Sequence, residues 1–241
     1  MSDDRIDAPL GALVDGTASA AVLDRFGLDY CCGGGRTLAD ACAPLGLHPA
    51  DVLDALDALA VDGGGDPGGE AWASMGPAEL VDHLEATHHA WLRGSLDRAL
   101  PLADKVAGVH GERHPELAEV QRLVHELADD LLPHLQKEER ILFPMIRELA
   151  TAEQSPEFHC GSLRNPIRVM GMEHDRAGEL LAELRAATGG YEVPADGCAS
   201  YRLLYEELTA LEADTHLHVH KENNVLFPAV VAMEDRLARS A

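Results

Sequence analysis

The chain has 241 residues, which suits one or two domains, and 46% of them are hydrophobic, as is ordinary for a protein with a packed core. Its formal net charge of −23 argues against nucleic acid and against an anionic membrane surface as partners. No apolar run approaches the roughly 20 residues of a membrane helix, and we see no signal peptide, so we expect a cytoplasmic protein. The five cysteines, two of them adjacent, favour reduced thiols over disulfides.

A glycine-rich segment at residues 63–70 divides the chain into two predicted domains. Its five glycines and one proline cannot hold a helix and are typical of a flexible linker. Residues 1–62 are predicted to form a small domain of short helices, with Cys31 and Cys32 in a loop between two of them. Residues 71–241 form the larger predicted domain.

The larger domain is predicted to consist of four long helices. Their expected spans are about 77–108, 115–150, 166–189 and 195–238, and the first three open at or near a proline. The connections are short apart from residues 151–163, and no alternating run of β-branched residues predicts a strand. We therefore predict an all-α fold, an up-down-up-down four-helix bundle with a small N-terminal helical domain.

An internal repeat runs through the larger domain. His, Lys, Glu, Leu, Phe and Pro recur in register, 84 residues apart, in segments 134–144 and 218–228. One helix earlier in each half, His89 and His174 stand 85 residues apart. Each half therefore carries a single histidine, then His-x-x-x-Glu, then Leu-Phe-Pro.

Side chains of this repeat form a predicted metal site, with ligands His89, His134, Glu138, His174, His218 and Glu222. Helix residues four apart share a face, so each His-x-x-x-Glu pair points at one place in the core. Imidazoles and carboxylates facing an apolar core are costly without a cation. Two bridging carboxylates with two histidines on each metal would hold two ions, and this ligation suits iron, manganese or zinc. The alternative is a duplicated bundle whose histidines lie at the surface. That alternative does not explain why both halves keep the His/Glu pair while neighbouring positions differ.

The repeat also separates the ligands from their neighbours. His88 has a glutamate as its counterpart and Glu139 has an asparagine, so we expect neither to bind metal. His216 and His220 have no histidine counterparts and are expected at the surface or beside the ligands. Each Leu-Phe-Pro segment is expected to kink its helix at the proline, to bury its phenylalanine and to carry no chemistry.

Three acidic residues are candidates for supporting the site or its access channel. Asp130 and Asp214 lie one turn before His134 and His218, where a carboxylate could accept a hydrogen bond from the second ring nitrogen of a ligand. Both are equally readable as solvated helix residues. Glu173, beside a ligand histidine, is a candidate for guiding ions or protons to the site.

The ligand pattern resembles that of hemerythrin-like domains. Its flanks resemble the bacterial repair of iron centres (RIC) family in particular, at residues 29–34, 137–144, 173–179 and 222–228. The resemblance covers nearly the whole chain and implies two non-haem iron ions, oxo- or hydroxo-bridged, with Glu138 and Glu222 bridging them and the four histidines as terminal ligands. Asp130 departs from the family, where a glutamate is expected.

The resemblance implies a role in repairing iron–sulfur clusters damaged by nitrosative or oxidative stress, with damaged iron–sulfur proteins as partners. We favour supply of iron without enzymatic turnover. Cys31 and Cys32 are candidates for redox chemistry or iron transfer, and a purely structural loop is the alternative. Two other functions stay open: a nitric oxide or peroxide reductase at the di-iron site, and a module that binds or senses dioxygen or nitric oxide. The oligomeric state is not determined by the sequence, and a homodimer stays open.

Overall fold

The computed structural model describes residues 4–61 and 71–240. Their regular structure is helical, with two isolated bridges, and the predicted all-α bundle is confirmed. Within those ranges no helix combines the length and the apolar character that crossing a bilayer requires. The predicted linker at 63–70 lies outside the described residues, and the predicted domain division there stays a prediction.

The described residues form two compact units. One unit, which we call the core unit, comprises residues 82–145 and 158–215. The other, the terminal unit, comprises the residues up to Val81, residues 146–157 and the chain from His216 onward.

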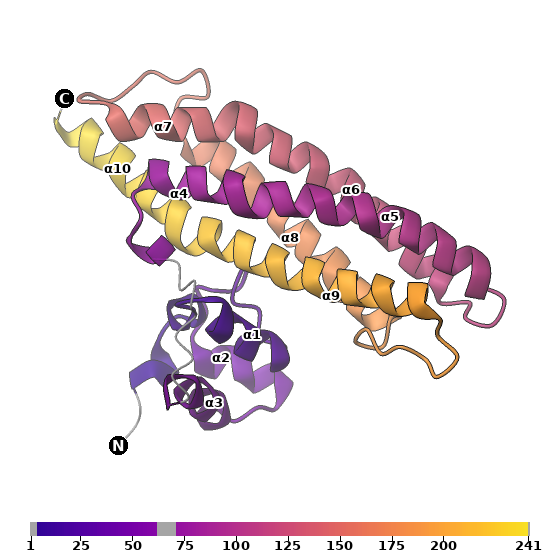
Figure 1. The fold of residues 1–241 in the computed structure, drawn as a ribbon. Helices are drawn as coiled ribbons and strands as arrows, with labels where there is room; N and C mark the ends of the chain where they lie inside the picture. Colours follow the sequence, from indigo (N-terminus) through magenta and orange to yellow (C-terminus); the bar gives the residue numbers. More distant parts are fainter. Residues whose placement is uncertain (1–3, 62–70, 241) are drawn as a thin grey trace. The chain divides into compact units, whose positions relative to one another are not determined.

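Four long helices make up the core unit: α5 (Ala90–His110), α6 (Leu117–Lys137), α8 (Arg164–Ala187) and α9 (Ala199–His220), whose last turn belongs to the terminal unit. They run alongside one another, and α6 packs against both α5 and α8 (Figure 1). Apolar residues recur three or four apart on α6 and are all buried: Val120, Leu123, Leu127 and Leu131. They join one hydrophobic core with residues of the other three helices.

Helix α8 ends where its glycines predict. Gly189 and Gly190 both adopt left-handed backbone, with φ of 62° and 78°, which is accessible to glycine at little cost. The N–H of Gly190 donates to the carbonyl of Arg185 and closes the helix end.

Three of the long helices contain a turn of π-helix: η5 (Glu85–His89), η6 (Glu138–Leu142) and η7 (Lys221–Leu226). The N–H of Phe143 donates to the carbonyl of Glu138, five residues back, and Phe227 donates to Glu222 in the same way. A proline follows each phenylalanine and lacks the N–H that would continue the α-helical ladder. The irregularity lies in the turn before each proline, the turn that a proline disturbs.

The terminal unit contains the short helices of the N-terminal segment and the outer parts of the long helices. These elements are η1 (Asp4–Asp7), η2 (Leu10–Leu13), α1 (Thr17–Arg25), α2 (Leu38–Cys42), η3 (Ala43–Leu45), α3 (Pro49–Val61), η4 (Ala71–Ser74), α10 (Phe227–Ser240) and η7, with most of α4 (Pro77–Leu84) and α7 (Phe143–Thr151). Helix α1 packs against α3. Thr37 caps α2 by accepting a hydrogen bond from the N–H of Asp40.

Two neighbouring leucines on α9 test how far the core stabilises the bundle. Leu204 is fully buried and Leu203 is 49% exposed. In the metal-free protein, Leu204→Ala should lower the free energy of unfolding by about 2–5 kcal/mol, because it leaves a cavity. Leu203→Ala should change it by less than about 0.5 kcal/mol. Urea unfolding measures both, and equal losses would contradict the packing described.

Candidate metal centre

The histidine and the glutamate of each His-x-x-x-Glu pair lie close together. His134 Nε2 lies 3.3 Å from an Oε atom of Glu138, and His218 Nε2 lies 3.3 Å from an Oε atom of Glu222. All four side chains are buried. The two halves of the repeat therefore present the same pair of donors, an imidazole nitrogen and a carboxylate oxygen on one helical face.

Two further histidines converge on the first of these pairs. His89, in η5, places its Nε2 3.4 Å from Glu138 Oε2. His174, on α8, places its Nε2 3.2 Å from His134 Nε2. Both rings are buried, so four helical segments supply imidazoles to the interior.

The six predicted ligands fall into two groups of four. Within each group the ligand atoms lie within 4.8 Å of one another, and the groups are His89, Glu138, His218 and Glu222, and His134, Glu138, His174 and Glu222. The two glutamates belong to both groups, as bridging carboxylates must. The histidines therefore pair as 89 with 218 and 134 with 174, an assignment that the sequence left open.

This donor set fits a pair of iron ions. Each group offers two imidazole nitrogens and two carboxylate oxygens, a mixed set that iron accepts readily. Two buried carboxylates need positive charge nearby, and two cations supply it. We propose these six residues as the ligands.

A carboxylate holds the outward-facing nitrogen of His89. Its Nδ1 lies 2.9 Å from Glu139 Oε1, and Arg93 donates two hydrogen bonds to the same carboxylate. An ionised carboxylate only accepts, so the ring proton sits on Nδ1 and the lone pair of Nε2 faces the site. Glu139 is not one of the grouped ligands, and its role in orienting His89 was missed. Arg93, one turn after His89, was the feature of the sequence that could have indicated a carboxylate beside this histidine.

Glu173 holds His134 in the same way. Its Oε2 lies 2.9 Å from His134 Nδ1, and the Lys137 ammonium pairs with its other oxygen. The hydrogen bond from His134, with help from Lys137 and against the effect of burial, lowers the pKa of Glu173 to about 2. The carboxylate is therefore ionised throughout the physiological range and remains an acceptor.

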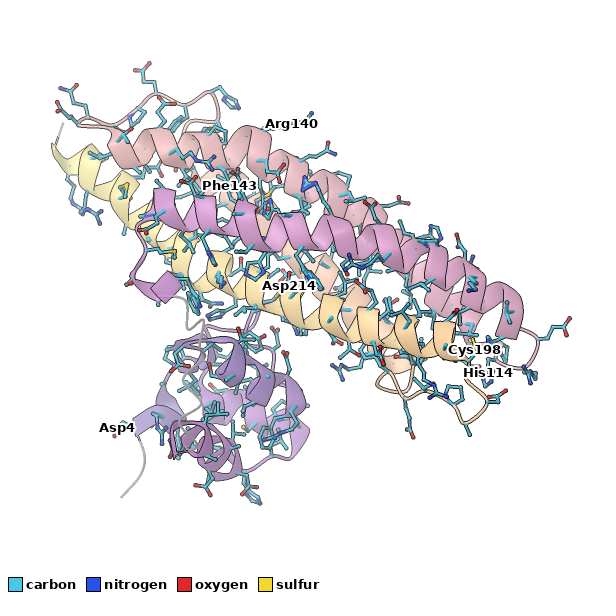
Figure 2. The ribbon with its side chains drawn as sticks, viewed as in Figure 1. Asp4, His114, Arg140, Phe143, Cys198 and Asp214 are labelled. Carbon is cyan, nitrogen blue, oxygen red and sulfur yellow. The ribbon has the colours of Figure 1, made fainter. Side chains whose placement is uncertain are left out.

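The two aspartates predicted to support ligands contact other side chains instead. Asp130 is largely exposed and lies 3.8 Å from the Arg176 guanidinium. Asp214 lies 2.9 Å from Nδ1 of His88, a buried histidine beside the ligand His89 (Figure 2). The observed carboxylate partners of His89 and His134 come from neighbouring helices rather than from one turn back.

Phe143 also shapes the site, although no chemistry was expected of its motif. Its ring is buried and stacks on the ring of His89, with centroids 5.3 Å apart and planes 27° apart. The stacking restricts the plane of the imidazole, while Glu139 fixes which nitrogen points inward.

A cavity of about 540 Å³ lies between α6 and α8 and is lined by His134 and His174. Charged side chains make up much of its wall: Asp129, Asp130, Lys137, Arg168, Glu173 and Arg176. Glu173 is thus both a wall residue of the cavity and the carboxylate that holds His134. The cavity offers a small ion or molecule a route to two of the histidines.

Cys31 and Cys32 are free thiols in a loop organised by Asp29. The Asp29 carboxylate accepts hydrogen bonds from the backbone N–H groups of Cys32 and Gly33 and from the Cys31 thiol. The contact with Cys32, together with burial, raises the pKa of Cys31 well above its ordinary value. The ligand atoms of Asp29 and the two cysteines lie within 4.8 Å of one another, so the proposed iron-transfer role keeps a plausible donor set.

Residues that differ between the repeat halves contact the Cys31 loop and α1 within the terminal unit. His216 Nδ1 lies 2.8 Å from Asp24, and His220 Nδ1 lies 3.3 Å from the carbonyl of Tyr30. The Asn224 amide donates to the carbonyls of Tyr30 and Cys31. Burial lowers the pKa of His220 to about 4, so its ring is neutral at neutral pH.

Comparisons with known proteins agree with this arrangement. Residues 80–230 match the Hemerythrin HHE cation binding domain family, and residues 6–60 match a Domain of Unknown function (DUF542). The iron-sulfur cluster repair protein YtfE of Enterobacter sp. (strain 638) is 34% identical over 229 residues, which cover 95% of this chain and 98% of the relative. Proteins of the same name from Escherichia coli O1:K1 / APEC and from Escherichia fergusonii match at the same identity and coverage.

Removing the carboxylate that holds His134 should weaken metal binding. Glu173→Ala deletes the acceptor for His134 Nδ1 and should lower the affinity for ferrous iron by about 10- to 100-fold. Glu179→Ala, on the same helix but exposed, is the matched control and should bind normally. Competition with a chelator under anaerobic conditions measures both affinities. Equal affinity in the two variants would show that Glu173 does not support the ligand.

Proposed function

The chain belongs to the family of iron–sulfur cluster repair proteins with a hemerythrin HHE domain, and we propose that its buried site holds the iron that such repair consumes. It is a di-iron protein of iron–sulfur cluster repair, and damaged iron–sulfur proteins are its targets. The observation that carries the proposal is the pair of four-residue groups sharing Glu138 and Glu222.

The chemistry of the donors supports donation as the direction of transfer. The site offers imidazoles and carboxylates and no thiolate, whereas iron–sulfur clusters hold their iron through cysteine thiolates. Iron in a nitrogen and oxygen environment therefore has softer donors to move to at a cluster that lacks it. The cavity lined by His134 and His174 is the path by which the cargo iron would leave.

The residues along that path have distinct tasks. Glu173 stays ionised and can accompany a cation past His134, and Lys137 offsets part of the charge when none is present. Glu138 and Glu222 contribute to both four-residue groups, so loss of either should weaken both iron positions. A cytoplasmic location belongs to this proposal and is supported by the five cysteines being free thiols.

Small-molecule chemistry is the second candidate function. Each group supplies four donor atoms, fewer than iron commonly takes, and the cavity leads to two of the histidines. Reduction of nitric oxide or peroxide, or reversible binding of dioxygen or nitric oxide, would use such an open position. Four histidines, against the five of oxygen-carrying hemerythrins, count against the oxygen-binding alternative.

Transfer of labelled iron separates the two functions. Protein loaded with isotopically labelled iron is mixed, without oxygen, with an iron–sulfur dehydratase damaged by nitric oxide. We expect dehydratase activity to recover and Mössbauer spectra to show the label in its cluster. Glu138→Ala should abolish both effects because it removes a donor from each iron position, whereas Glu148→Ala, exposed on α7, should retain them. If dehydratase activity recovers and nitrous oxide is released, but no labelled iron enters the cluster, iron donation is refuted.

A further inference from the structure

Cys198 lies against a buried histidine, away from the metal ligands. Its Sγ is 3.1 Å from Nε2 of His110, the last residue of α5. Cys198 is exposed, whereas His110 is only 4% exposed. Figure 2 labels Cys198 beside His114 at the end of the bundle where α9 begins. About 30 Å of helix separates this end of α9 from the ligand His218.

The position of His110 is determined by packing. Its ring meets Tyr201 edge-on, with centroids 5.4 Å apart, and lies 6.4 Å from the ring of His114. Its Nδ1 is buried and has no hydrogen-bond partner among the described residues, so the polar contact of the ring is with Cys198. A ring that donates from Nε2 makes a charge-assisted hydrogen bond to a thiolate.

The start of α9 provides further donors for a thiolate. Backbone N–H groups of Tyr201 and Ser200, in its first turn, face the sulfur. The hydrogen bond from His110 and these amides together lower the pKa of Cys198 to about 7. About half of the thiol is therefore ionised near neutral pH, the range in which an attacking thiol performs best in exchange.

Charged neighbours complete the surroundings. His114 lies 2.9 Å from Asp196 and 3.1 Å from Glu116, and these carboxylates, Asp196 foremost, raise the pKa of its ring. The Arg113 guanidinium lies 3.4 Å from Asp196. The mouth of the site thus carries both signs of charge and is accessible from solvent, where a small charged molecule can approach.

We propose that Cys198 and His110 form a thiol-modification site that exchanges with low-molecular-weight disulfides. The Cys198 thiolate attacks one sulfur of the small disulfide and forms a new S–S bond with it. The S–S bond of the small molecule breaks, and its second sulfur leaves with the electron pair as a thiolate, which takes a proton from water. His110 is a positioning residue, because its N–H holds the thiolate in place and the proton of the thiol goes to solvent.

The mixed disulfide should persist because the core unit has no second thiol close by. Its other cysteine, Cys160, precedes α8, and Cys198 follows that helix. The 24 residues of α8 separate the two cysteines by about 36 Å. Cys160 therefore cannot displace the small thiol, and the core unit contains no other cysteine that could restore Cys198. The site does not depend on bound iron.

Oxidised glutathione is a suitable probe with the full-length protein. Mass spectrometry of digested samples should find the glutathionyl group on Cys198 before Cys160, and the rate should rise with a midpoint at a pH of about 7. Cys198→Ser should lose this adduct, and Cys160→Ser should retain it. His110→Leu should move the midpoint toward the ordinary thiol pKa of about 8.5 and slow exchange at neutral pH by about fivefold. His110→Gln, which keeps a side-chain N–H, should restore part of the rate.

Circular dichroism checks that each variant is folded. An unmodified Cys198, or one that reacts no faster than Cys160 in the wild-type protein, would overturn the proposal. So would a folded His110→Leu protein whose midpoint stays at a pH of about 7. If that variant does not fold, the ratio of rates at Cys198 and Cys160 and the behaviour of His110→Gln still decide the question.

Discussion

The burial of two carboxylates in the core is the constraint on which the rest of the site depends. Glu138 and Glu222 have no exposed surface, and burying even one ionised carboxylate costs several kcal/mol before compensation. Cations bound between them would offset that cost for both carboxylates at once. The four histidines that we propose as ligands lie around the same place, and the carboxylates of Glu139 and Glu173 hold two of the rings at the opposite nitrogen.

The π-turns allow a helix to direct a candidate ligand and a core side chain toward the same region. In an α-helix, residues five apart differ by roughly 140° in direction, so Glu138 and Phe143 would face different sides. The wider turn, closed by the bond from Phe143 N–H to the Glu138 carbonyl, reduces that difference. Phe143 can then stack on His89 while Glu138 approaches the same ring from the site. The proline after Phe143 favours the wider turn by removing an α-helical donor.

The sequence predicted the candidate ligands, because their positions follow from helix periodicity. It did not predict the carboxylates that hold the ligand rings, because those come from neighbouring helices. A spacing of four and a repeat of 84 residues are local facts, and they single out His134, Glu138 and their counterparts. Which carboxylate reaches which ring nitrogen depends on how the helices are rotated against each other. Glu139 therefore holds His89 instead of a ligand on its own helix, and Asp214 contacts His88.

The same reasoning explains why the two halves of the repeat differ outside the ligands. The core imposes one requirement on both halves, a histidine and a glutamate four residues apart, and leaves the outer positions unconstrained. In the first half Lys137 pairs with Glu173, the carboxylate that holds His134, and lines a cavity. In the second half the outer positions bind the thiol loop, through Asn224 and the carbonyl of Cys31. One duplicated helix turn therefore serves two tasks, because burial constrains only its inner face.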